Sequence, residues 1–148
     1  MNLLSPDDKP ACLNSGLDPD WWFPESPGQG KHAQNLPEYQ VMIEQSVQAM
    51  TVCNDCPLML NGKCIDYAMS DTTTIDFGIF AGTLPFERRG ACGSPTIGAG
   101  NGLVFQVHIR KAADKAGLIK PLIPRQERPR PSFYDYFGKE ISSASSLD

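Results

Sequence analysis

Four cysteines constrain the fold of this chain more than any other feature: Cys12, Cys53, Cys56 and Cys64. Cys53 and Cys56 form a CxxC pair, Cys64 follows shortly after, and Cys12 stands far upstream. Four thiolates can complete a tetrahedral zinc site or hold an iron–sulfur cluster. We therefore expect a bound metal, rather than a large hydrophobic core, to hold the loop-rich first half together.

The cysteine spacing alone leaves several kinds of site open. Zinc is the commoner ligand of four cysteines in small domains, but zinc sites usually use two CxxC-like pairs, and Cys12 is alone. Iron–sulfur clusters accept one remote ligand. A thioredoxin-like redox pair would need a βαβ context, which is missing here. Four unrelated buried cysteines would leave the clustering unexplained.

Length and composition indicate one small domain, or one small domain with an appendage. The chain has 148 residues, of which 41% are hydrophobic, and it contains 13 Gly and 13 Pro, so irregular structure is extensive. We find no apolar run long enough to cross a membrane and no secretory signal. We expect a cytoplasmic protein without membrane contact. The odd cysteine count, five with Cys92, argues against complete disulfide pairing.

Charge is distributed unevenly along the chain. Residues 1–87 carry 3 Lys/Arg against 12 Asp/Glu, whereas residues 88–130 carry 9 against 2. An acidic surface repels nucleic acid, while a basic one attracts it. Any DNA contact is therefore predicted in the second half.

Hydrophobic periodicity predicts short helices, with no strand-like alternation. We expect helices or helical turns over residues 37–50, 57–63, 64–69, 85–89 and 103–116. The fold class is therefore a small, mostly α, metal-stabilised domain with a C-terminal helix and an irregular tail.

The remaining segments are predicted to be irregular. Residues 71–76 are interpreted as a connector, and residues 77–82 as a tight turn between glycines. Residues 121–131 are rich in Pro and Arg and are expected to be extended.

Three motifs in order carry a family resemblance. Cys12 is followed by DPDWWFPE at residues 18–25; CxxCPxxxxxxC is followed by DYA within residues 53–68; and FGIFAG at residues 77–82 is followed by ERR. Over residues 12–89 the chain resembles the WhiB-like regulators of actinobacteria and their phages. On this basis we divide it into a disordered leader (1–11), the WhiB-like domain (12–89), a flexible linker (90–102), and a basic helix with a Pro/Arg-rich tail (103–148).

The resemblance implies a [4Fe–4S] cluster ligated by Cys12, Cys53, Cys56 and Cys64, with zinc as the alternative cofactor. It also implies regulation of transcription through the C-terminal domain of the primary sigma factor of RNA polymerase, and reaction of the cluster with nitric oxide and oxygen. The sigma-binding residues expected from the resemblance are Trp21, Trp22, Phe23, Gly78, Ile79, Phe80 and Gly82.

The chain departs from the family pattern at two places. Seven residues separate Cys56 from Cys64, which is longer than usual, and we expect a small bulge that preserves ligation. In the glycine turn, Phe80 and Ala81 replace the usual Trp and Gly. Phe80 keeps a large apolar ring but lacks the indole N–H, so sigma contact is expected to be weakened or retuned.

The basic half gives a DNA-binding hypothesis, with a solvated charged face as the alternative. The residues assigned to DNA contact are Arg88, Arg89, Arg110, Lys111, Arg125, Arg128 and Arg130. No nucleophile and base occur in a useful context, so we predict that the protein is not an enzyme. The other functions considered are a disulfide reductase active in the metal-free form and a zinc-stabilised interaction module. We also expect the metal-free domain to be largely unfolded.

Overall fold

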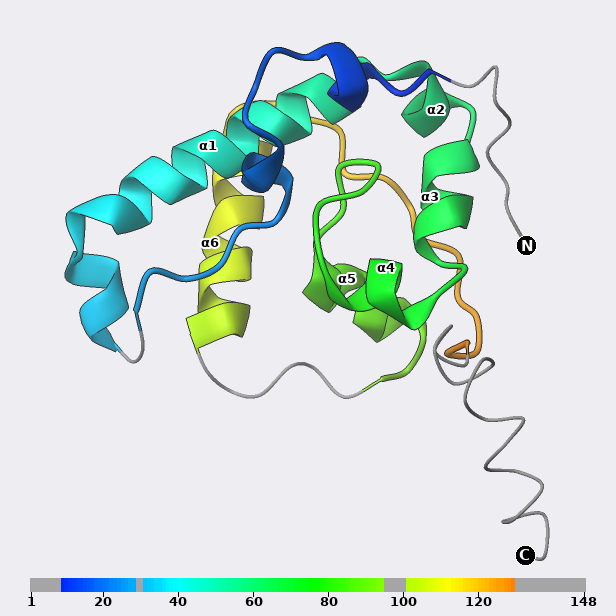
Figure 1. Ribbon diagram of the computed structural model, residues 1–148. Helices are drawn as coiled ribbons and strands as arrows, with labels where there is room; N and C mark the ends of the chain where they lie inside the picture. Colours follow the sequence, from blue (N-terminus) through cyan, green and yellow to red (C-terminus); the bar gives the residue numbers. More distant parts are fainter. Residues whose placement is uncertain (1–8, 29–30, 95–100, 130–148) are drawn as a thin grey trace, which may run out of the picture.

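Figure 1 shows the computed structural model, which describes residues 9–28, 31–94 and 101–129. Within these ranges the chain forms short helices joined by turns, with no sheet and one isolated bridge between Phe80 and Thr83. The predicted mostly helical fold is confirmed. None of the helices in the described ranges is long and apolar enough to span a membrane.

The elements follow one another without internal repetition. In chain order they are η1 (Ala11–Asn14), η2 (Pro19–Trp22), η3 (Lys31–Asn35), α1 (Pro37–Asn54), α2 (Pro57–Leu60), α3 (Lys63–Ala68), α4 (Thr72–Asp76), α5 (Pro85–Ala91) and α6 (Asn101–Lys115).

Helix α1 is the longest element and delivers a cysteine to the core. Pro37 occupies its first turn, where no backbone N–H is needed. Its buried positions recur at three- and four-residue spacing and end at Cys53. The helix is thus one turn longer than predicted, and that extra turn carries Cys53 inward.

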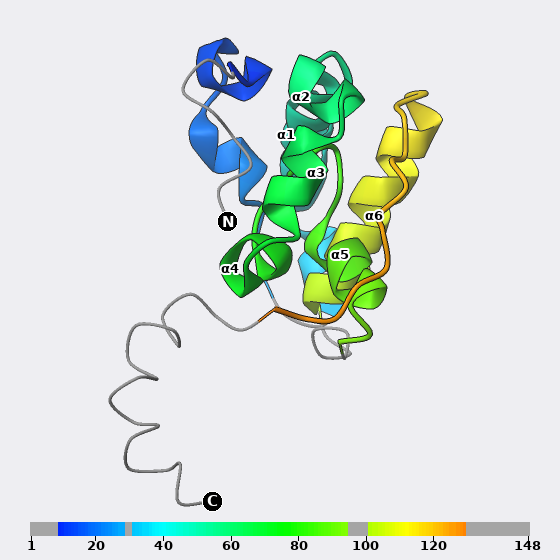
Figure 2. The same cartoon turned by 90° about the vertical axis from the view of Figure 1, so that its right-hand side faces the viewer.

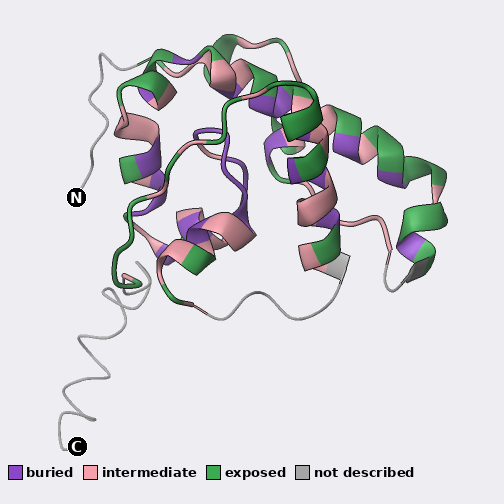
Figure 3. Ribbon diagram, turned by 180° about the vertical axis from the view of Figure 1, so that it is seen from behind, coloured by how far each residue is buried: buried purple, intermediate pink, exposed green. Residues whose placement is uncertain are grey.

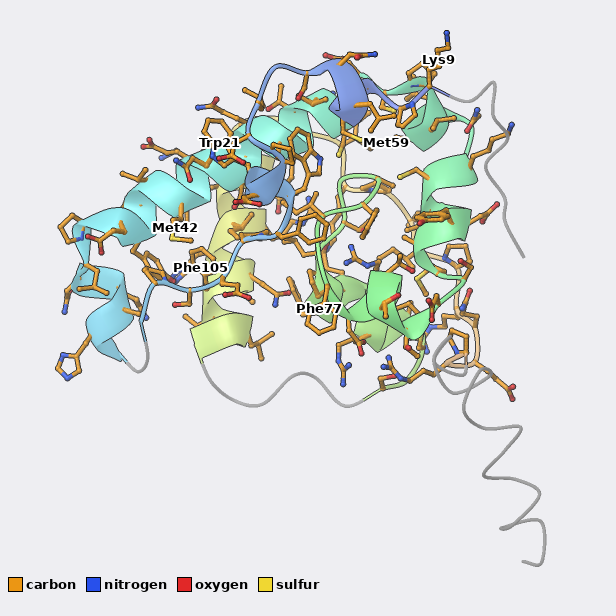
Figure 4. All side chains as sticks on the ribbon, in the orientation of Figure 1. Lys9, Trp21, Met42, Met59, Phe77 and Phe105 are labelled. Atoms are coloured by element: carbon orange, nitrogen blue, oxygen red, sulfur yellow. The ribbon has the colours of Figure 1, made fainter. Side chains whose placement is uncertain are left out.

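Helix α6 packs against one side of α1, and the N-terminal strip, which we define as residues 10–23, lies on the other (Figure 2). Phe105, Ile109 and Ala113 are buried in this contact. The rings of Tyr39 and Phe105 meet edge-on at 5.1 Å between centroids. Figure 4 labels Phe105 on α6 and Trp21 on the strip. The C-terminal helix is therefore part of the core and not a free appendage.

Residues 71–76 differ from the prediction, because Thr72–Asp76 form helix α4. Threonine has low helix propensity, so the sequence favoured a connector. Burial of Thr72 and Ile75 and a hydrogen bond from Thr74 Oγ1 to the Ala68 carbonyl (2.7 Å) stabilise the turn. Tertiary packing overrides local propensity here.

Beyond α6 the chain crosses the domain again as a C-terminal strap, residues 118–129, without helix or strand. It appears in orange in Figures 1 and 2. The Ile119 N–H donates to Asn54 Oδ1 (2.8 Å) and the Gln126 side chain donates to the Met69 carbonyl (2.7 Å). Residues 1–8 of the expected leader, residues 95–100 of the expected linker and the tail from residue 130 lie outside the described residues. The ends of the expected linker are not flexible coil, because residues 90–91 belong to α5 and residues 101–102 to α6.

Candidate metal centre

All four predicted cysteine ligands line one cavity of about 300 Å³. Cys12 comes from η1, Cys53 from the last turn of α1, Cys56 from the start of α2 and Cys64 from α3. The rest of the lining is mainly apolar: Pro10, Leu13, Pro19, Trp22, Phe23, Met59, Ile79, Phe80 and Ala81. Segments far apart in the sequence thus present four thiols to one apolar space.

The CxxC pair is shaped by the junction between α1 and α2. The Cys56 N–H donates to the Cys53 carbonyl (3.0 Å), and the Met59 N–H donates to the Cys56 carbonyl (3.1 Å). Cys12 reaches the pair because the Ala11 N–H donates to Cys56 Sγ at 3.3 Å. These bonds place the upstream cysteine beside the other three.

The long gap before Cys64 is occupied by helix α2 and a left-handed turn. Gly62 has φ +82° and precedes α3 directly, a conformation that suits glycine. The extra length therefore forms regular structure, and Cys64 still faces the cavity.

The glycine turn, residues 77–82, closes the cavity with backbone N–H groups. Two successive residues, Ala81 (φ +53°) and Gly82 (φ +70°), adopt left-handed conformations. Burial raises the pKa values of Cys64 and Cys53, and hydrogen bonds from the backbone at Ala81 and Gly82 partly oppose that rise. Consecutive N–H groups aimed at one site favour anions and recur at iron–sulfur sites. The buried residues of this turn show as purple in Figure 3.

Burial disfavours the charged thiolate form of the cavity cysteines. Burial and the neighbouring Cys53 raise the pKa of Cys64 to about 12. Burial also raises the pKa values of Cys53 and Cys12. Thiolates are the metal-binding form, so bound iron or zinc would supply the missing positive charge.

The donor set fits zinc or an iron–sulfur group. Soft thiolates select zinc or iron–sulfur groups. The Trp22 indole N–H, also at the cavity, is buried without a hydrogen-bond partner. The site therefore offers four soft ligands and, in the Trp22 indole, one donor suited to anionic sulfur.

Arg88 holds the glycine turn in place through hydrogen bonds to backbone carbonyls. Its side chain is fully buried, and it donates to the carbonyls of Ile75 (3.2 Å), Thr83 (2.6 Å), Phe77 (3.2 Å) and Gly78. Burial lowers the pKa of Arg88 to about 10, so it stays charged at neutral pH. The Arg88 guanidinium is not exposed, so it is not available for the predicted contact with DNA. This arginine instead positions the glycine turn.

Three further arginines assigned to DNA are engaged in ion pairs within the fold. Arg110 is buried against Glu87, and Arg89 contacts Asp76 at 2.6 Å. Arg128 also binds Asp76, at 2.5 Å. A guanidinium already paired with a carboxylate is less available to phosphate.

The other assigned cations are located differently. Lys111 and Arg125 are exposed. Arg130 lies outside the described residues.

The predicted sigma-binding residues fall into an exposed set and a supporting set. Phe23 is 53% exposed at the cavity, its ring edge-on to the half-buried Phe80 (6.4 Å between centroids). Trp22 and Ile79 are buried, and the Ile79 N–H donates to the Trp22 carbonyl (2.6 Å). Trp21 is half-buried and lines a different hollow.

Gly78 and Gly82 are buried in the glycine turn. They allow its backbone conformation and do not form part of an exposed surface. A Cβ on Gly78 would lie 2.7 Å from the Phe23 ring, so only glycine allows that ring to sit there.

Two aromatic residues at this face were not predicted. Tyr67 packs edge-on against Phe80 (6.1 Å between centroids), and Phe77, the first residue of the glycine turn, is 63% exposed. Tyr67 belongs to the DYA motif, whose spacing from the cysteines could have indicated a role. Figure 4 shows Phe77 on the glycine turn near α4 and α5.

A scan of protein families matches residues 7–90, more than half of the chain, to the family described as "Transcription factor WhiB". The chain belongs to the WhiB family. Searches of curated proteins and of solved structures found no match. The WhiB match covers all four cysteines of the cavity and the glycine turn, and it ends before α6. Membership in this transcription factor family confirms the prediction that the chain is not an enzyme.

Proposed function

We propose that this WhiB-family transcription factor holds a [4Fe–4S] cluster on Cys12, Cys53, Cys56 and Cys64. The observation that carries the proposal is the shared cavity of the four cysteines, whose rim bears exposed aromatic rings. When bound, the cluster would supply reactivity toward nitric oxide and oxygen.

The cofactor proposal is tested by iron and acid-labile sulfide analysis of the full chain purified without oxygen. We expect brown protein containing both elements, whereas a colourless protein with zinc would contradict the proposal. Replacing any one of the four cysteines by serine should abolish or sharply reduce bound iron. Cys92→Ser is the matched control, because Cys92 does not line the cavity.

We further propose that the cavity rim binds the C-terminal domain of the primary sigma factor. Phe23 and Phe80 pair at the mouth, and large aromatic residues are favoured anchors at protein interfaces. Arg88 lies over the Phe80 ring, 5.4 Å from its centroid, and keeps it in place. Because the same residues line the cavity, changes at the cysteines can reach the rim directly.

The sigma proposal is tested by binding of the cluster-loaded protein to the isolated sigma domain. Phe23→Ala should weaken binding at least tenfold without loss of iron. Val41→Ala is the control, since Val41 is similarly exposed, at 50%, on α1. Equal affinities of the two variants would contradict the assignment.

Finally, we propose cytoplasmic action with DNA contact by exposed cations of the C-terminal part. Of the residues first assigned, Lys111 and Arg125 are exposed and retain this role. Arg88 and Arg110 are left out because their charges are buried.

A further inference from the structure

The indole N–H of Trp22 is a buried donor that the fold leaves unused. The Trp22 side chain is 6% exposed, and its Nε1 has no hydrogen-bond partner in the described part of the chain. Buried polar groups are nearly always satisfied, and an exception calls for an explanation. The cavity that Trp22 lines is therefore the place where a bound group could accept this hydrogen bond.

The surroundings of Trp22 direct the donor toward sulfur. Trp22 and Cys53 line the same cavity and pack in the same buried cluster. Apart from the cysteines, the cavity is lined largely by apolar residues such as Leu13, Met59 and Ile79. Sulfur is thus the acceptor available to this N–H at the site.

The indole is also held rigidly in place. Asp18 caps the short helix η2 by accepting from the Asp20 N–H (2.9 Å). The Trp22 carbonyl accepts from the Ile79 N–H (2.6 Å), which ties the N-terminal strip to the glycine turn. A donor fixed in this way needs no rearrangement to meet a ligand.

Core filling alone does not account for a tryptophan here. A phenylalanine would fill apolar space without burying an unpaired donor. The neighbouring Trp21 is half-buried and does not line the cysteine cavity. The two tryptophans therefore provide an internal comparison within one strip.

We propose that the Trp22 indole donates a hydrogen bond to an anionic sulfur of the bound cluster, at or beside Cys53, and thereby raises the cluster's reduction potential. This inference rests on the proposed iron–sulfur cofactor. Hydrogen bonds to cluster sulfurs favour the more negatively charged, reduced state. When one electron enters, the proton stays on the indole nitrogen and the hydrogen bond strengthens. Trp22 is a positioning and tuning residue rather than an iron ligand.

The experiment compares Trp22→Phe and Trp21→Phe with the wild type, as full chains loaded with cluster under anaerobic conditions. The readout is the midpoint potential from a mediated redox titration. We expect Trp22→Phe to bind the electron several-fold less tightly; a tenfold loss corresponds to about 59 mV for a one-electron couple. Trp21→Phe should leave the potential unchanged.

A second measurement tests the proposal even if the Trp22→Phe protein fails to assemble the cluster. The chain has 2 Trp, so Trp21→Phe leaves Trp22 as the single indole. Incorporating 5-fluorotryptophan into this variant makes the N–H a stronger donor, and the potential should rise. An unchanged potential on fluorination overturns the inference, as does a Trp22→Phe potential equal to that of the wild type. Absence of iron and sulfide from the wild-type protein would instead refute the cofactor proposal.

Discussion

Arg110 and Glu87 form a buried, two-armed ion pair that joins α6 to α5. Arg110 Nε and Nη2 each lie 2.7 Å from a Glu87 carboxylate oxygen, and both side chains are less than a tenth exposed. Nη2 also donates to the Gly82 carbonyl (2.7 Å). A helix beyond the family match thus supports the turn that closes the cysteine cavity.

Removing one partner of this pair should be strongly destabilising. Arg110→Leu leaves the Glu87 carboxylate buried and unpaired, which typically costs about 3–5 kcal/mol. The measurement is denaturant unfolding of the cluster-loaded protein. The control is Lys111→Ala on the exposed side of α6, expected within about 0.5 kcal/mol of the wild type. If Arg110→Leu and Lys111→Ala were equally stable, the ion pair would not be what stabilises the contact between α6 and α5.

Replacing Gly78 should displace the exposed ring of Phe23. Gly78→Ala places an L-residue at φ +82°, which costs about 1–2 kcal/mol, and brings a Cβ to 2.7 Å from that ring. We expect weaker sigma binding together with lower stability.

Gly62→Ala is the matched control for Gly78→Ala. Gly62 has the same φ of +82°, but nothing lies within 4 Å of its added Cβ. It should therefore show the backbone cost without loss of sigma binding. Equal binding losses in the two variants would exclude the ring contact as the cause.

The cysteine site could be predicted from sequence because its ligands belong to ordered local motifs. Cys64 lines the cavity despite the longer gap before it, since α2 and Gly62 accommodate the added residues. The roles of the arginines could not be predicted, because a charge pattern does not reveal burial. Arg88, on α5, donates to carbonyls in and next to the glycine turn, and Arg128 contacts a carboxylate far away in the sequence.

Removal of the cluster should loosen the cysteine region more than the rest of the domain. Helix η1 has no buried residue, whereas α1 and α6 share a core containing Phe105 and Ile109. The sequence predicted that the whole metal-free domain would be largely unfolded. Because of this packing, we expect the loss of structure to be concentrated in the cysteine region. We expect fast hydrogen exchange over residues 10–23 after chelation, and continued protection of α1 and α6. Equal exchange throughout, measured by mass spectrometry, would favour global unfolding.

The ion pairs of Asp76 should determine which strap arginine contacts DNA. Each phosphate contact contributes about −0.9 to the slope of log affinity against log salt concentration. Arg125→Ala should therefore make the slope shallower by about 1. Arg128→Ala should change it less, because Arg128 already holds Asp76 at 2.9 and 2.5 Å.

The Asp76→Asn variant tests the same competition between carboxylate and phosphate by removing the carboxylate. Without the carboxylate, the Arg128 charge becomes available, so the slope should steepen and Arg128→Ala should then reverse the gain. The measurement is DNA binding by fluorescence anisotropy across a salt series, with full-length, cluster-loaded protein. Salt-independent binding would rule out phosphate contact altogether. Equal effects of Arg125→Ala and Arg128→Ala in the wild-type background would show that the Asp76 pair does not compete with phosphate.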